Sequence, residues 1–187
     1  YFADCVFTDE VLPLDLLRDM VAPCTGANLA IDDYEHINSD LSILRPYLKK
    51  SIENGRKGAS IFLYGPPGTG KSQLAKVLAR ELRCELFEVT SEALDGDPIT
   101  GERRLRAYRA AQCFFANGHS LILFDEVEDV FDNGNGFFGH KSTAQTHKAW
   151  INRTLEENPI PTLWLSNSIK GLDPAFIRRF DMVFELP

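Results

Sequence analysis

The fold is decided by one stretch, Ile61-Phe62-Leu63-Tyr64-Gly65-Pro66-Pro67-Gly68-Thr69-Gly70-Lys71-Ser72. Its first four residues form an apolar run that predicts a strand over 60–64. The eight residues that follow fit the pattern G-x-x-x-x-G-K-[ST] in full. Behind them, Leu74, Val77, Leu78 and Leu82 recur at helical spacing and predict a helix over 71–83. A strand, a glycine-rich loop and a helix in this order predict a phosphate-binding loop in an α/β protein.

The residue types of this loop suit phosphate chemistry. Glycines let successive backbone N–H groups curl inward toward phosphate oxygens, and the next helix points its positive end at the same place. Lys71 offers a cation to the β- and γ-phosphates of a nucleotide, and the Ser72 hydroxyl can ligate Mg²⁺. The expected phosphate-binding residues are Gly65, Pro66, Pro67, Gly68, Thr69, Gly70, Lys71, Ser72 and Gln73. The alternative is a tight Gly/Pro turn that binds nothing.

Two carboxylates follow another apolar run, Leu121-Ile122-Leu123-Phe124, which has no polar alternation and predicts a strand buried on both faces. Unpaired burial of Asp125 and Glu126 would be costly, so we expect both at the carboxyl edge of the sheet. There Asp125 would hold Mg²⁺ together with Ser72, and Glu126 would act as general base on the attacking water. The alternative is a surface pair that caps the next helix.

Polar residues also end the later apolar runs. Asn167 follows the apolar run 162–166, where its amide could hydrogen-bond both a water molecule and a γ-phosphate. Farther on, Asp173-Pro174 predicts the start of a short helix that ends in Arg178 and Arg179. Such arginines can stabilise charge on a transferred phosphoryl group. The alternatives are a turn-forming Asn167 and arginines that pair with local carboxylates.

The remaining chain alternates short apolar runs with longer amphipathic segments, which predicts a parallel sheet covered by helices on both faces. The runs span 60–64, 85–90, 120–124, 162–166 and 182–186, and the main helical segments span 40–54, 71–83, 102–117 and 141–157. Residues 1–33 form a separate N-terminal appendage. Its stripe of Leu16, Leu17, Met20 and Val21, ended by Pro23, predicts a helix.

Composition limits the classes of function. The chain has 187 residues and a net charge of −7, which disfavours a protein whose main partner is a nucleic-acid backbone. We accordingly interpret the cationic run of Arg103, Arg104, Arg106 and Arg109 as a solvated or subunit-facing surface. No apolar run approaches the ~20 residues of a membrane span. Four cysteines without metal-binding spacing indicate free thiols in a reducing cytoplasm.

These motifs together resemble the nucleotide-binding domain of the AAA family of ATPases over residues 34–187. Gly65–Ser72 resembles the family's Walker A motif and 121–126 its Walker B motif, while Asn167 falls at the sensor-1 position. The segment 172–181 is similar to the region that carries the finger arginines. Tyr34-Glu35-His36-Ile37 resembles the segment that cradles adenine, which assigns His36 and Ile37 to the nucleotide.

The resemblance implies a three-layer αβα fold with a five-stranded parallel sheet in the order 5-1-4-3-2. It also implies ATP and Mg²⁺ as ligands, assembly into a ring that is commonly hexameric, and finger arginines that act on a neighbour's ATP.

Three features depart from the family pattern. Arg178 and Arg179 are adjacent, whereas the family separates its arginines, so one of them could be an ordinary ion-pair residue. The helical lid would follow Pro187, so we expect the lid to be absent from this sequence. The segment 98–102 lacks the aromatic residue by which some members thread polypeptides.

The favoured hypothesis is a cytoplasmic, Mg²⁺-dependent ATPase that works as a ring and remodels a protein partner. Glu126, Asn167, Arg178 and Arg179 would be its catalytic residues. One alternative is a nucleotide-gated scaffold with negligible hydrolysis. Another is a nucleic-acid motor or loader built on the same core, whose basic surface would lie in another domain.

Overall fold

The structure, a computed structural model, describes residues 17, 20–24, 26–93, 96–131 and 148–187. One sheet dominates it, with strands in the order β1-β3-β4-β5-β2-β6. Five neighbouring strands run parallel, and β1 joins the edge antiparallel to β3. The strands are β1 (Val21–Pro23), β2 (Ser60–Tyr64), β3 (Glu85–Val89), β4 (Ser120–Phe124), β5 (Thr162–Ser166) and β6 (Met182–Glu185).

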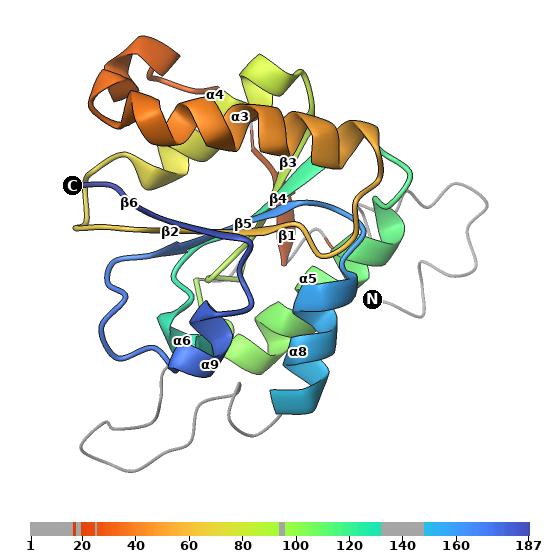
Figure 1. The fold of residues 1–187 in the computed structure, drawn as a ribbon. Helices are drawn as coiled ribbons and strands as arrows, with labels where there is room; N and C mark the ends of the chain where they lie inside the picture. Colours follow the sequence, from red (N-terminus) through yellow and green to blue (C-terminus); the bar gives the residue numbers. More distant parts are fainter. Residues whose placement is uncertain (1–16, 18–19, 25, 94–95, 132–147) are drawn as a thin grey trace.

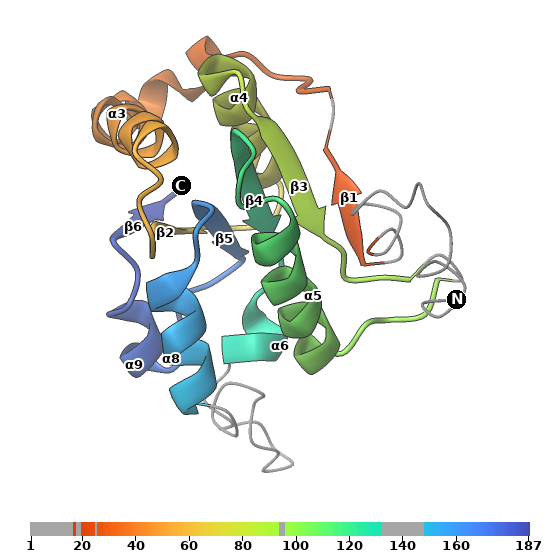
Figure 2. The same cartoon turned by 90° about the vertical axis from the view of Figure 1, so that its right-hand side faces the viewer.

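Helices cover both faces of this sheet. Figure 1 shows α3 (Asn38–Glu53) and α4 (Lys71–Leu82) on one face, and α5 (Gly101–Phe114), α8 (Lys148–Glu157) and α9 (Pro174–Ile177) on the other. The short α6 (Glu128–Phe131) lies on the same side as α5 and α8, and Figure 2 shows it beside α5. The 3₁₀ segment η1 (Ile31–Ile37) leads into α3. The predicted three-layer αβα class is confirmed.

Strand alternation produces the two layers of the core. Ile61 and Leu63 of β2 pack with α3 and α4, whereas Phe62 between them packs with the aromatic cluster on the opposite face. All four residues of the 121–124 run are fully buried, as their unbroken apolar character predicts. Trp164 of β5 anchors the second layer against Phe124, Tyr108 and Phe131.

The sheet contains one strand more than the sequence predicts. Its five parallel strands, numbered along the chain, lie in the predicted order 5-1-4-3-2, but β1 raises the total from five to six. Val21 therefore belongs to a strand and not to the predicted helix. Pro23 is tolerated there because an edge strand needs no second hydrogen-bonding partner.

This edge strand bears on the predicted division of the chain. Backbone N–H groups of Cys24 and Thr90 donate to Leu86 and Met20 and close the pairing of β1 with β3. Residues 21–23 of the predicted appendage thus pair with the core sheet. Residues 1–16, 18 and 19 lie outside the described part, and a boundary near residue 34 stays a prediction.

Two further sequence predictions concern the cysteines and membrane-spanning segments, and the structure addresses them over the described residues alone. Cys24, Cys84 and Cys113 are free thiols. Within the described ranges, no helix combines the length and the apolar composition that a membrane crossing requires.

Candidate active site

The predicted site residues follow the ends of three adjacent strands. β5 lies between β2 and β4, and Tyr64 of β2 is in register with Ser166 of β5. The Gly65 N–H donates to the Ser166 carbonyl at 3.3 Å, which brings the start of the glycine-rich loop beside the end of β5. The loop, the acidic pair and Asn167 therefore share one edge of the sheet, where open α/β proteins bind their ligands.

The glycine-rich loop has the backbone geometry that its sequence predicts. Gly68 and Gly70 have φ values of 86° and 84°, a region that favours glycine. Gly70 precedes the first residue of α4, and a Cβ at this position would lie 3.0 Å from the Tyr34 hydroxyl. At Gly65 a Cβ would lie only 1.9 Å from the Leu186 carbonyl oxygen. A side chain at Gly65 would therefore clash with the backbone, and one at Gly70 would crowd the Tyr34 hydroxyl.

Lys71 begins α4 and extends its side chain back under the loop. Its Nζ donates to the carbonyls of Gly65 and Pro66 at 2.8 and 2.9 Å and to Asn167 Oδ1 at 3.3 Å. The residue is only 6% exposed. Burial lowers the Lys71 pKa, while the negative charges of Asp125 and Glu128 oppose that shift. A phosphate group beside Nζ would supply the full negative charge that these carbonyl partners lack.

Ser72 and Asp125 meet across the sheet edge. The Ser72 hydroxyl donates to Asp125 Oδ2 at 2.7 Å, and Asp125 Oδ1 accepts from the Glu126 N–H at 2.8 Å. A hydroxyl and a carboxylate are hard oxygen donors of the kind that Mg²⁺ prefers. The donor set therefore fits the predicted metal pair.

Glu126 and Asn167 share a pocket of about 490 Å³ next to this pair. Both residues are exposed, and Glu126 has a φ of 52°, in the left-handed region that a non-glycine residue seldom adopts. The pocket is also lined by Ser91, Pro98, Ile99, Thr100, Gly101, Arg104, Glu128 and Asp129. A carboxylate and an amide are the kinds of group that accept a proton from a water molecule and orient it.

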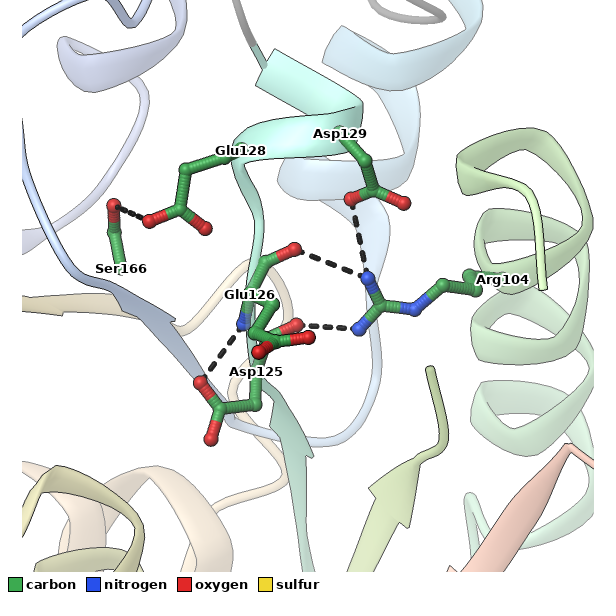
Figure 3. Close-up of polar contacts among 6 residues, drawn as sticks. All are labelled: Arg104, Asp125, Glu126, Glu128, Asp129 and Ser166. Atoms are coloured by element: carbon green, nitrogen blue, oxygen red, sulfur yellow. Dashed lines mark hydrogen bonds and ion pairs between the residues drawn. The ribbon is translucent and has the colours of Figure 1, made fainter. Parts of the chain in front are cut away.

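Sequence reasoning missed Glu128, which fixes the end of β5. Its Oε1 accepts from the Ser166 hydroxyl at 2.8 Å and from the Asn167 N–H at 2.6 Å, and Figure 3 shows the first of these bonds. Glu128 lies two residues beyond the acidic pair, in the run Asp125-Glu126-Val127-Glu128-Asp129. That clustering of carboxylates was the available signal, but the partner on β5 is 38 positions away.

Arg104 corrects the interpretation of the cationic run on α5. The sequence predicts a solvated or subunit-facing residue, yet Arg104 is 1% exposed, whereas Arg103, Arg106 and Arg109 are exposed. Its guanidinium donates to the backbone carbonyls of Asp125 and Glu126 and to Asp129 Oδ1 (Figure 3). Helical periodicity alone did not reveal that this one position faces the sheet edge.

The adenine-side residues lie next to the loop through Tyr34. The Tyr34 hydroxyl donates to the Gly70 carbonyl at 2.8 Å, and His36, two residues on, is exposed. The Ile37 side chain is buried. Gln73 accepts from the Asn28 N–H at 2.9 Å, which ties the segment before η1 to α4.

The two arginines lie apart from the pocket lining. Arg179 forms an ion pair with Glu156 of α8, while Arg178 Nε donates to the Pro174 carbonyl at 3.3 Å within its own short helix. Both arginines are exposed. Among the described residues that line the pocket of Glu126 and Asn167, neither arginine is present.

Comparisons with known proteins find a matching family and related sequences. Residues 61–187 match the sequence model of the family described as "ATPase family associated with various cellular activities (AAA)". The chain is 32% identical over 178 residues to ATP-dependent zinc metalloprotease FtsH 2 of Bdellovibrio bacteriovorus, an alignment that covers 84% of this chain and 28% of that protein. It is 29% identical to a 26S proteasome regulatory subunit 8 homolog of Encephalitozoon cuniculi, over 68% of this chain and 34% of that protein.

A solved structure shows the same fold. The structure of the E. coli MS115-1 HORMA:CdnC:Trip13 complex contains a chain that superposes with a TM-score of 0.57 at 18% identity, covering 88% of this chain and 68% of that one. The present chain spans about a third or less of the length of the curated relatives named above.

Proposed function

The chain belongs to the AAA family of ATPases, and from that premise we propose that it binds ATP with Mg²⁺ and hydrolyses it. The observation that carries this proposal is the meeting of Lys71, Ser72, Asp125 and Asn167 at one edge of the sheet. Ser72 and Asp125 lie 2.7 Å apart, and Lys71 and Asn167 lie 3.3 Å apart. These four residues come from three separate strand ends, so a simple glycine-rich turn does not account for their arrangement.

Each side chain has a defined part in binding. The loop backbone over 65–73 and Lys71 would hold the phosphates, and Ser72 and Asp125 would hold Mg²⁺, which neutralises phosphate charge when bound. To do so, Ser72 and Asp125 would give up their mutual hydrogen bond, which would free both oxygen donors for the metal ion or its water molecules. His36 and the Ile37 backbone would contact the adenine from η1.

Glu126 and Asn167 would act on the attacking water. Glu126 accepts a proton from the water as the water attacks the γ-phosphorus, and Asn167 orients the same water and the γ-phosphate. General-base catalysis of this kind contributes about 10²–10⁴ in rate. Glu126 is exposed in the pocket, so a water molecule can reach its carboxylate.

We further propose that the active form is a ring, hexameric as is common in the family, in which an arginine from one subunit completes the site of the next. Arg178 is the better candidate, because Arg179 already pairs with Glu156 within its own subunit. An arginine of this kind stabilises charge on the transferred phosphoryl group and is worth about 10³–10⁵ in rate.

The proposed partner is a protein that the ring remodels in the cytoplasm. The names of two relatives support a protein partner, since one is a protease and another a proteasome regulatory subunit. The net charge of −7 disfavours a nucleic-acid backbone as the main partner.

Phosphate release from ATP tests the proposal. We expect saturable turnover that disappears when Mg²⁺ is chelated and when Lys71→Met removes the phosphate-binding cation. The matched control is Lys49→Met, which removes an exposed lysine from α3 outside the site and should leave turnover unchanged. Turnover that persists in Lys71→Met at the wild-type rate, or that never appears although ATP binds, would overturn the proposal.

A further inference from the structure

A buried arginine joins α5 to the turn that carries the acidic pair. Arg104 Nη1 donates to the Glu126 carbonyl at 3.0 Å, and Nη2 donates to the carbonyl of Asp125 (Figure 3). One planar guanidinium therefore donates hydrogen bonds to two successive carbonyls of the turn. Its third partner is Asp129 Oδ1 at 3.1 Å, in the first turn of α6.

The surroundings of Arg104 hold its guanidinium in the orientation that these hydrogen bonds require. Its guanidinium lies over the ring of Phe124, the last residue of β4, at 4.4 Å from the ring centroid. Its side chain is 2% exposed, so neither bulk water nor alternative rotamers compete for the donors. The fork geometry matters here, because a guanidinium holds its N–H groups in one rigid plane, whereas a lysine ammonium is a point charge on a flexible stem.

The held turn contains the backbone conformation that most needs support. Glu126 has a φ of 52°, which is unfavourable for a residue with a Cβ and persists only when its surroundings enforce it. Arg104 binds the carbonyls on both sides of the N–Cα–C unit of Glu126, and the next amide, Val127 N–H, donates to Leu165 O of β5 at 3.1 Å. These bonds fix the direction in which the Glu126 side chain leaves the backbone.

We propose that Arg104 is a positioning residue for catalysis: it holds the Asp125–Glu126 turn in its left-handed conformation and thereby aims the Glu126 carboxylate at the attacking water. This inference rests on the proposed ATPase function and adds to it a residue that acts through the backbone of the acidic turn. It also identifies α5 as the helix whose position determines whether the general base is aligned.

The alternative role for Arg104 is a structural ion pair with Asp129. The Asp129 carboxylate is 40% exposed on its side chain, and burial raises the Asp129 pKa while Arg104 partly offsets that rise. The charged groups that face this carboxylate are Arg104, Glu126 and Glu128. Under this alternative, Asp129→Asn and Arg104→Met would have similar consequences.

Steady-state hydrolysis and ATP binding distinguish the two roles. Arg104→Met keeps an unbranched apolar side chain but removes every donor, and we expect kcat to fall by about tenfold or more while the Kd for ATP stays within about threefold. Arg104→Lys should fall between this variant and wild type. Asp129→Asn keeps both carbonyl bonds and should leave kcat within about threefold. The matched control is Arg106→Met, which removes an exposed arginine of the same helix that pairs only with Glu102 among the described residues.

A second measurement does not depend on activity. In Arg104→Met, hydrogen exchange at the Val127 amide should accelerate by about tenfold or more, whereas the Ile122 amide in the middle of β4 should exchange as in wild type. Unchanged Val127 exchange, equal losses of kcat in Arg104→Met and Asp129→Asn, or a parallel loss of ATP binding would each overturn the proposal. If wild type fails to hydrolyse ATP but Val127 exchange responds as expected, the proposed function fails and the positioning contact stands.

Discussion

At the residue scale, Lys71 is a binding residue whose surroundings disfavour its positive charge. The side chain is nearly buried, and its Nζ contacts two carbonyls and an amide oxygen, none of which carries a full negative charge. Burial lowers its pKa, so the folded protein binds this proton more weakly than the unfolded chain does. The site thus holds a cation whose charge is best compensated by a bound phosphate.

This environment predicts a pH dependence of stability in the absence of nucleotide. Between the lowered pKa of Lys71 in the folded protein and the usual lysine pKa of 10.5, the unfolded chain binds more protons at Lys71, so the free energy of unfolding should rise with pH in that interval. The Lys71 penalty is complete below its folded pKa and vanishes above the unfolded one. Urea unfolding of wild type and Lys71→Met from about pH 7 to 10 measures this penalty. The free energy of unfolding of wild type should increase relative to that of the variant as the pH rises. A constant difference, or one that moves the other way, would contradict the assignment.

The sequence predicts those site residues whose chemistry is local. Lys71, Ser72, Asp125 and Asn167 each follow a strand, and residues that follow adjacent parallel strands meet at one edge. Arg104 could not be predicted in the same way. Its main acceptors are backbone carbonyls 21 and 22 positions away, which have no signature in the amino-acid sequence.

At the scale of elements, Glu128 connects α6 to β5. Through one carboxylate oxygen it holds the Ser166 hydroxyl and the Asn167 N–H, so the acidic turn and the sensor amide are placed relative to each other. The same carboxylate contributes negative charge to the environment of Lys71. A helix of four residues thereby positions a residue on a neighbouring strand.

Replacement of Glu128 should disturb the alignment of Asn167 without a comparable effect on ATP binding. Glu128→Ala removes the acceptor for Asn167, and we expect kcat to fall by about tenfold with little change in the Kd for ATP. Glu128→Gln keeps an oxygen acceptor in the same place and serves as the matched control, with kcat reduced by less than about threefold. Steady-state phosphate release measures kcat, and equilibrium ATP binding measures the Kd. Equal effects of the two replacements would mean that the charge, and not the acceptor, is what matters.

Helices and strands with a strong periodicity of apolar residues were predictable from the sequence, whereas strand β1 was not, for a physical reason. Five strands and four main helices follow from apolar runs that alternate with amphipathic segments, although positions 141–147 of the predicted helix 141–157 lie outside the described residues. β1 did not follow, because a strand of three residues is too short to show alternation, and Leu17, Met20 and Val21 also fit helical spacing. The pairing of β1 with β3 is a tertiary contact between segments about 65 residues apart, which local patterns do not encode.

At the scale of the whole molecule, the proposed ring completes each site with residues from two subunits. Arg179 pairs with Glu156 and Arg178 lies at the exposed end of α9, and neither arginine is among the described residues that line the pocket of Glu126. The ring proposed above would bring Arg178 of one subunit to the nucleotide of the next.

Mixing two inactive variants tests this arrangement. Glu126→Gln lacks the base but keeps the arginine, and Arg178→Ala lacks the arginine but keeps the base, so a mixed ring contains some complete sites. Random mixing gives about one competent pair in four and should restore up to about a quarter of wild-type hydrolysis. Arg179→Ala, used as the matched variant, should itself remain largely active. No recovery on mixing, with subunit exchange verified by a labelled chain, would place the arginine in the same subunit as its site.

The most direct test of the central claim is the identity of the nucleotide that stays bound after incubation with ATP and Mg²⁺. Wild-type protein should retain ADP, and Glu126→Gln should retain intact ATP in a similar amount, because this substitution removes the base and leaves Lys71, Ser72 and Asp125 in place. If Glu126→Gln instead retains ADP formed at the wild-type rate, Glu126 is not the general base. If wild type retains only unhydrolysed ATP, the chain is a nucleotide-gated binder and not an ATPase.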